Sequence, residues 1–238
     1  MVTYWELLQA IVKQNSARPL YTWLSDAGRI ELSAVTFLNA VSKASNFLTD
    51  GLYLEPPASV EVSLGNHWQS PVWLGAALST GLTITDQSGD FMFAPISEVE
   101  NSAIALSNFV VISTHPFGVP DKSLPQECID GSTEVRNFGD VYLPLNVNSE
   151  ESISVTSHDK HFTWQEIERL SSEIIGRFNL VPGENFGIVG KADLATTVAL
   201  QAAIPVIYSS QVVLIDQPDA DVDSIVTQEK LSKIVYLD

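Results

Sequence analysis

Two stretches of the chain share the same order of short apolar runs and helix-like segments, and this repetition limits the fold more than any other feature of the sequence. Pro57 precedes an apolar run at 62–65, and Pro182 precedes a second run at 187–190, in both comparisons 125 positions later. Alternating strand and helix patterns favour right-handed crossovers and parallel sheets covered on both faces. The sequence therefore predicts an α/β fold of two pseudo-repeated, mainly parallel α/β subdomains.

Further landmarks accompany this repeat. Residues 106–110 match 231–235 at the same offset, whereas the helix-capping residues Ser33 and Thr163 lie 130 positions apart. A few residues have therefore been inserted or lost between the two stretches. The alternative is that generic strand and helix units resemble one another by chance.

The segment 115–150 separates the two stretches. It is rich in proline, glycine and asparagine, and it is long for a connection inside a compact domain, so we expect one short strand within it, at 134–138. The predicted organisation has a first α/β subdomain with an N-terminal helix at 1–114, a connecting segment at 115–150, and a second α/β subdomain at 151–238.

Local patterns predict the individual elements. Capping boxes at Thr3 with Glu6 and at Thr163 with Glu166 each indicate the start of an amphipathic helix. Further helices are expected at 33–51, after 65–68 and ending at 81, and at 96–107, 193–203 and 222–230. Strands are expected at 20–24, 29–32, 60–64, 82–85, 109–113, 153–156, 186–189, 212–215 and 234–237.

The charge balance excludes some classes of partner. Twelve Lys and Arg stand against 29 Asp and Glu, giving a formal net charge of -17, which would repel nucleic acid and anionic membrane surfaces. The opening of the chain does not resemble a secretory signal, and the single cysteine, Cys128, fits a reducing compartment. We therefore expect a cytoplasmic protein without nucleic-acid or membrane partners, in which Cys128 is an inert thiol.

Polar residues at the carboxyl ends of the predicted strands form the candidate ligand cleft, because open α/β sheets bind their ligands there. These residues are Asn66, His67, Trp68, Ser113, Thr114, Thr156, Ser157, His158, Lys160 and Asp216, and Asp86, His115, Lys191 and Asp193 occupy similar positions.

Three short motifs resemble parts of catalytic or metal-binding sites, but none predicts a catalytic residue or a metal ligand. The run 187–192 lacks the first glycine and the final Ser or Thr of a phosphate loop. Ser157 with Lys160 has the spacing of a nucleophile and its base, but a polar turn before a helix has the same pattern. His158 and His161 are better explained by a solvated loop than by a zinc site, because no further ligands are evident.

The residues 28–33, 60–64 and 73–81 resemble the opening of the AMP-binding, adenylate-forming enzymes, which include the acetyl-CoA and acyl-CoA synthetases. Residues 153–157 are similar to the strand and the first two residues of that family's Thr-Ser-Gly phosphate loop. The stretches 115–118 and 133–140 look like segments of short, uncharacterised actinobacterial proteins similar to those enzymes. The resemblance implies a fold like the N-terminal region of acetyl-CoA synthetase-like enzymes.

The departures from this family concern its phosphate site. Thr156 and Ser157 match the family's loop and Lys160 stands near the place of its lysine, but His158 to His161 replace the glycine-rich residues. The chain also stops before the family's later motifs. We therefore expect a non-catalytic protein that binds a small ligand or a protein partner, with no cofactor predicted. Two alternatives are a residual acyl-adenylating enzyme using ATP, AMP or CoA, and a homodimeric interaction module.

Overall fold

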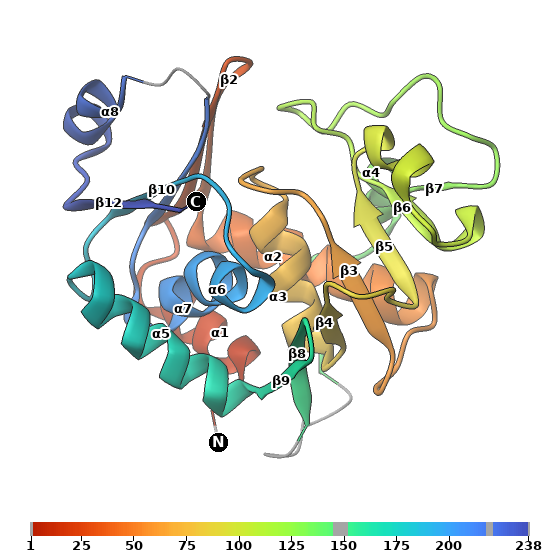
Figure 1. Ribbon diagram of the computed structural model, residues 1–238, viewed down its shortest axis with the longest axis horizontal. Helices are drawn as coiled ribbons and strands as arrows, with labels where there is room; N and C mark the ends of the chain where they lie inside the picture. Colours follow the sequence, from red (N-terminus) through yellow and green to blue (C-terminus); the bar gives the residue numbers. More distant parts are fainter. Residues whose placement is uncertain (1, 145–151, 218–220, 238) are drawn as a thin grey trace.

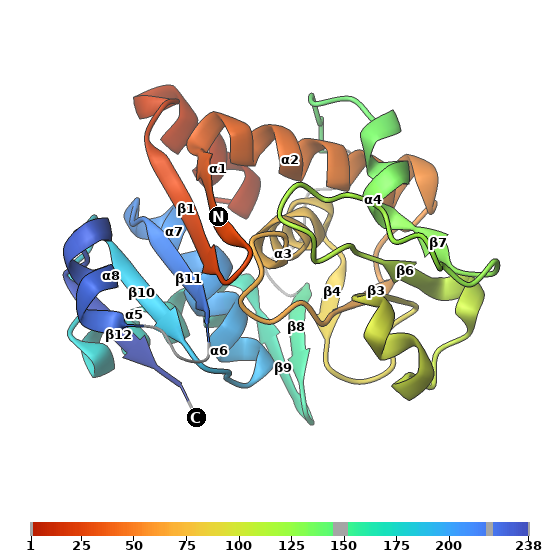
Figure 2. The same ribbon diagram turned by 90° about the horizontal axis from the view of Figure 1, so that it is seen from above.

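The computed structural model describes residues 2–144, 152–217 and 221–237 of the chain. The described residues form two sheets that lie side by side (Figures 1 and 2). The five-stranded sheet has the order β12 (Lys233–Tyr236), β10 (Phe186–Val189), β11 (Val212–Asp216), β1 (Pro19–Ser25) and β2 (Gly28–Ser33). The seven-stranded sheet has the order β7 (Ile129–Asp130), β6 (Phe109–Val111), β5 (Phe91–Ala94), β3 (Ser59–Val62), β4 (Thr83–Thr85), β8 (Ile153–Ser157) and β9 (Lys160–Thr163).

Helices cover and separate these sheets. They are α1 (Tyr4–Asn15), α2 (Ala34–Asn46), α3 (Ser70–Thr80), α4 (Gly131–Glu134), α5 (Trp164–Phe178), α6 (Leu194–Val198), α7 (Ile204–Tyr208) and α8 (Val222–Glu229). Both predicted capping boxes are present: Thr3 with Glu6 begins α1, and Thr163 with Glu166 begins α5. No helix in the described part of the chain is long and apolar enough to cross a membrane.

Most neighbouring strands are parallel, and the predicted mainly parallel α/β class is confirmed. The two antiparallel pairs are the hairpins β1–β2 and β8–β9. Each hairpin joins the sheet made by the other half of the chain: β1 pairs with β11, and β8 pairs with β4. Residues 19–33 precede the predicted boundary at 114 but belong to the five-stranded sheet, and residues 153–163 follow the boundary at 151 but belong to the seven-stranded sheet. The predicted boundaries therefore do not separate the two sheets.

The two sheets place corresponding elements in the same order. β10 lies between β11 and β12 as β3 lies between β4 and β5, and a hairpin follows β11 in one sheet and β4 in the other. The spatial counterpart of β12 is thus β5. The sequence match of 106–110 with 231–235 instead pairs β12 with β6, so this landmark does not mark equivalent strands.

Four predicted elements differ in the structure. The helix expected at 33–51 is α-helical to Asn46 and then widens into a π-type turn at 47–51. The helix expected at 96–107 is two short 3-10 turns, 96–101 and 106–108. The strand expected at 134–138 is helical, because Asp130 accepts a hydrogen bond from the Thr133 N–H and begins α4. The helix expected at 193–203 begins at the Asp193 cap but widens into a π-type turn at 199–203 and continues as α7.

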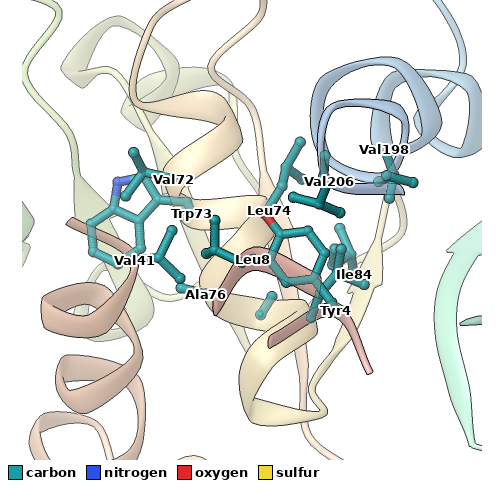
Figure 3. Close-up of a cluster of buried hydrophobic side chains, with 14 of the residues drawn as sticks. Tyr4, Leu8, Val41, Val72, Trp73, Leu74, Ala76, Ile84, Val198 and Val206 are labelled. Atoms are coloured by element: carbon teal, nitrogen blue, oxygen red, sulfur yellow. The ribbon is translucent and has the colours of Figure 1, made fainter. Parts of the chain in front are cut away.

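The core is shared by both halves, and α3 lies within it. Every residue of α3 is buried, which agrees with its lack of a polar face. Figure 3 shows Trp73, Leu74 and Ala76 of α3 among side chains of α1, α2 and the C-terminal half. At Gly75 an added Cβ atom would lie 2.6 Å from the Tyr4 hydroxyl oxygen, so this glycine allows α1 to approach α3 closely.

Candidate functional site

A cleft of about 620 Å³ lies where the carboxyl ends of the two sheets face each other. One wall comes from the ends of β3 and β4 and the turn after β8, and the opposite wall from the end of β10 and from α6 (Figure 1). The described residues that line it are Glu61, Val62, Ser63, Gly65, Asn66, Ser70, Thr85, Asp86, Gln87, His158, Ile188, Gly190, Lys191, Ala192, Asp193, Leu194, Thr197, Leu200, Gln201 and Leu237. Sheets of this kind bind their ligands at such a position.

The carboxylate of Asp86 accepts hydrogen bonds from the turn between β8 and β9. Ser157 pairs with Lys160, so the turn has two central residues, and the first, His158, has a positive φ of 54°. The Asp86 carboxylate accepts hydrogen bonds from the His158 N–H at 2.9 and 3.1 Å and from the Ser157 hydroxyl at 3.0 Å. The Gln87 amide donates to the His158 carbonyl at 2.7 Å. Residues at the end of β4 therefore fix this turn.

A network of amides joins the two walls at the base of the cleft. The Asn66 amide nitrogen donates to the carbonyl oxygens of Gly190 at 3.0 Å and Ile215 at 3.3 Å. The buried Gln201 side chain donates to the Asn66 side-chain oxygen at 3.1 Å and accepts from the Ser70 hydroxyl at 2.7 Å. These bonds connect the seven-stranded sheet with the five-stranded sheet, so the base of the cleft is held from both sides.

Acidic groups predominate over basic groups in the cleft. Glu61, Asp86 and Asp193 are the lining carboxylates, and Lys191 is the only Lys or Arg among the described lining residues. Burial, and then the nearby Asp86, raises the pKa of Glu61. Asp193 caps α6 by accepting the Thr196 N–H at 3.0 Å. A negatively charged ligand would meet more repulsion than attraction here.

Four of the ten predicted cleft residues lie at or beside this cleft. Asn66 and His158 line it. The Ser157 hydroxyl donates to Asp86, and Thr156 pairs with Thr85 across the sheet, so both residues are neighbours of lining residues. Whether these residues bind a ligand remains a prediction.

His67 and Trp68 lie elsewhere, because the chain turns inward after Asn66. The His67 ring is buried against Trp23, with ring centroids 4.7 Å apart, and against Trp68 at 5.7 Å. Burial lowers the pKa of His67 to about 4, so the ring is neutral. Trp68 lines a second pocket between α2 and α3.

The other four predicted residues do not line the cleft either. Ser113 is buried and structural: its carbonyl accepts from Gln69, and its hydroxyl donates to Val119. Thr114, Lys160 and Asp216 are exposed. In the described ranges no group of three or more His, Cys, Asp or Glu could hold a metal ion.

Two important residues were missed by the sequence analysis. Glu61 was not predicted as a site residue, although it lies one position before the end of β3, and ligands bind beyond the carboxyl ends of such strands. Gln201 is a polar residue inside the apolar run 198–204, and such an interruption indicates a buried hydrogen-bonding role.

Comparison with known proteins identifies the fold. No family model matches the chain. A protein of Mycobacterium tuberculosis, an actinobacterium, named "TIGR03089 family protein", is 33% identical over 152 residues, which cover 58% of this chain and 61% of the relative. The crystal structure of the Brucella canis acyl-CoA synthetase is similar with a TM-score of 0.77 at 12% identity, over 97% of this chain and 47% of that protein. The chain thus spans under two thirds of either protein, and the predicted resemblance is confirmed for the fold.

Proposed function

We propose that this chain is a non-adenylating protein with an acyl-CoA synthetase-like fold, which binds a small, polar, non-anionic molecule in the cleft between its sheets. The observation that carries the proposal is the position of Asp86. Its carboxylate already accepts the His158 N–H and the Ser157 hydroxyl, at the turn that the resemblance aligns with a phosphate loop.

A phosphate in that turn would need the same donors. Backbone N–H groups that point at an anion are the usual basis of phosphate binding. Here the His158 N–H is used by a side-chain carboxylate, and a second anion beside Asp86 would be repelled. Lys191 alone would have to offset three lining carboxylates. These features support a cleft that does not hold ATP, AMP or CoA phosphates.

The same carboxylates favour a ligand with positive charge. The pKa of Glu61 is raised by burial and by the charge of Asp86, so its ionised form lacks a compensating partner among the described residues. An ammonium group near Glu61 would supply one. The amide network of Asn66 and Gln201 offers a fixed polar surface for the remainder of a small ligand.

The non-adenylating part is tested by ATP–pyrophosphate exchange and by isothermal titration with ATP, AMP and CoA. No exchange and no heat of binding are expected from the purified chain. Measurable exchange with any carboxylic acid would overturn this part. The Asp86→Asn variant is the matched comparison, because it keeps an acceptor for Ser157 and removes the charge that excludes phosphate.

The ligand class is tested with two probes of similar size and opposite charge, ethanolamine and glycolate. Ethanolamine should raise the melting temperature of the wild type, and glycolate should leave it unchanged. Glu61→Gln should abolish the difference. Equal stabilisation by both probes, or a larger effect of glycolate, would contradict the proposed preference.

A further inference from the structure

A second pocket of about 210 Å³ lies between α2, α3 and the segment that carries α4. Figure 2 shows these three helices on the same side of the molecule, away from the turn between β8 and β9. The walls of this second pocket are mainly apolar and include Trp68, Val72, Trp73 and Phe117. Its location and its lining differ from those of the cleft.

The charges of this pocket are opposite to those of the chain. Lys43 and Arg136 line it, and no Asp or Glu is among its described lining residues, although the chain carries a formal net charge of -17. Lys43 donates one hydrogen bond to the Phe138 carbonyl at 2.8 Å, and Arg136 donates one to the Gly118 carbonyl. Both side chains have further N–H donors, so they can also bind an anion.

The two tryptophans of the pocket contribute apolar ring surface. The indole Nε1 atoms of Trp68 and Trp73 are buried, and neither has a hydrogen-bond partner within the described part of the chain. Trp73 is 2% exposed. Because neither Nε1 atom is accessible, a molecule in the pocket would contact the indole rings and not these N–H groups.

The pocket is also where two unexplained sequence stretches meet. The residues 115–118 and 133–140 resemble segments of short actinobacterial proteins, but neither stretch lines the cleft. Phe117 and Gly118 line the pocket from the first stretch, and Val135 and Arg136 from the second. The Arg136–Gly118 hydrogen bond joins the two stretches.

We propose that this pocket binds a small aromatic molecule that bears one negative charge. The tryptophan and phenylalanine side chains contact its ring, and Lys43 and Arg136 hold its anionic group. At roughly 30 Å³ for each water-sized group, the pocket volume of about 210 Å³ holds about seven such groups, which suits a single substituted ring. The proposal is independent of the ligand proposed for the cleft.

The experiment is isothermal titration of the whole chain with benzoate, benzenesulfonate and the neutral analogue benzamide. The two anions should bind roughly tenfold or more tightly than benzamide, because only they can pair with the two cations. Equal affinity for benzamide would overturn the proposal. Nitrogen-resolved NMR spectra provide a second readout: of the five tryptophan indole signals, those of Trp68 and Trp73 should move with benzoate. Shifts confined to the other indoles would also overturn it.

Two variants locate the binding. Arg136→Gln should weaken benzoate binding about tenfold, whereas Arg18→Gln, which also loses a charge and an arginine bond to a backbone carbonyl, should not. Ala40→Leu fills the pocket without removing any hydrogen-bonding group, and should abolish binding. This variant remains informative if Arg136→Gln does not fold. Binding of benzoate that survives in a folded Ala40→Leu protein would contradict the assignment.

Discussion

The carboxylate of Asp86 accepts the backbone N–H of His158, 72 positions later in the sequence, at 2.9 and 3.1 Å. This contact joins the end of β4 to the turn of the hairpin that β8 and β9 form. It fixes that hairpin beside β4, and it places a negative charge where the resemblance to adenylate-forming enzymes would place a phosphate. Asp86 thus both fixes the conformation of the turn and gives it a negative charge.

Asp86→Ala should lower the free energy of unfolding by about 1–3 kcal/mol, the range expected when a hydrogen-bonded charged partner is lost. The Ser157 hydroxyl and the His158 N–H both lose their acceptor in this variant. Urea unfolding measures the change. The control is Asp159→Ala in the same turn, which removes the same charge and should have a small effect. Equal losses in the two variants would contradict the role of Asp86.

Gly190→Ala should destabilise the protein by more than about 1 kcal/mol. Gly190 has a φ of 91°, and an added Cβ atom would overlap the Leu237 carbonyl. The matched control is Gly176→Ala in α5, where no atom of the described residues lies within 4 Å of the added atom and helix propensity predicts a gain of roughly 0.5–1 kcal/mol. Chemical denaturation compares the two variants, which should change stability in opposite directions.

Sequence reasoning was most successful where the cause is local. The capping boxes at Thr3 and Thr163 depend on residues three positions apart, and both helices begin there. The rule that ligands bind at carboxyl ends of strands placed Asn66 and His158 at the cleft. The same rule failed for His67, because it says nothing about whether the next side chain turns into the core.

The sequence did not predict that each hairpin joins the sheet formed by the other half of the chain. The pattern of residues 19–33 indicates two antiparallel strands, but it does not say which third strand they join. That choice is made by long-range packing, with Tyr21 opposite Val212 and its hydroxyl 2.7 Å from the Gln201 carbonyl oxygen. The role of Gln201 depends on the same arrangement, since its partners Asn66 and Ser70 come from the other half of the chain.

Tyr4→Phe should leave the free energy of unfolding unchanged or raise it by up to about 1 kcal/mol. The Tyr4 hydroxyl is buried without a hydrogen-bond partner in the described structure, and burial raises the pKa of Tyr4. Tyr21→Phe is the comparison: it makes the same chemical change but removes the bond to the Gln201 carbonyl, which should cost about 1–3 kcal/mol. Thermal and urea unfolding of both variants should separate them clearly, and a larger loss in Tyr4→Phe would show that its hydroxyl has a partner.

The pH dependence of stability should carry a contribution from His67. Its ring is 2% exposed, and burial lowers its pKa from 6.5 to about 4. Between these values the unfolded chain binds a proton that the folded chain does not. Stability from this residue is therefore fully present above pH 6.5 and is lost as the pH falls towards 4.

A shift of this size corresponds to a loss of roughly 3 kcal/mol, at about 1.4 kcal/mol for each pKa unit. Carboxylates also titrate at the acidic end of this range, so the wild type must be compared with His67→Gln at each pH. The unfolding free energy of the wild type minus that of His67→Gln should be largest at pH 7 and should decrease as the pH falls to 4.5, because only the wild type contains the buried imidazole. A difference that stays constant over this range would mean that His67 has the same pKa in the folded and the unfolded protein, and its packing against Trp23 and Trp68 would then have to accommodate a charge at pH 4.5.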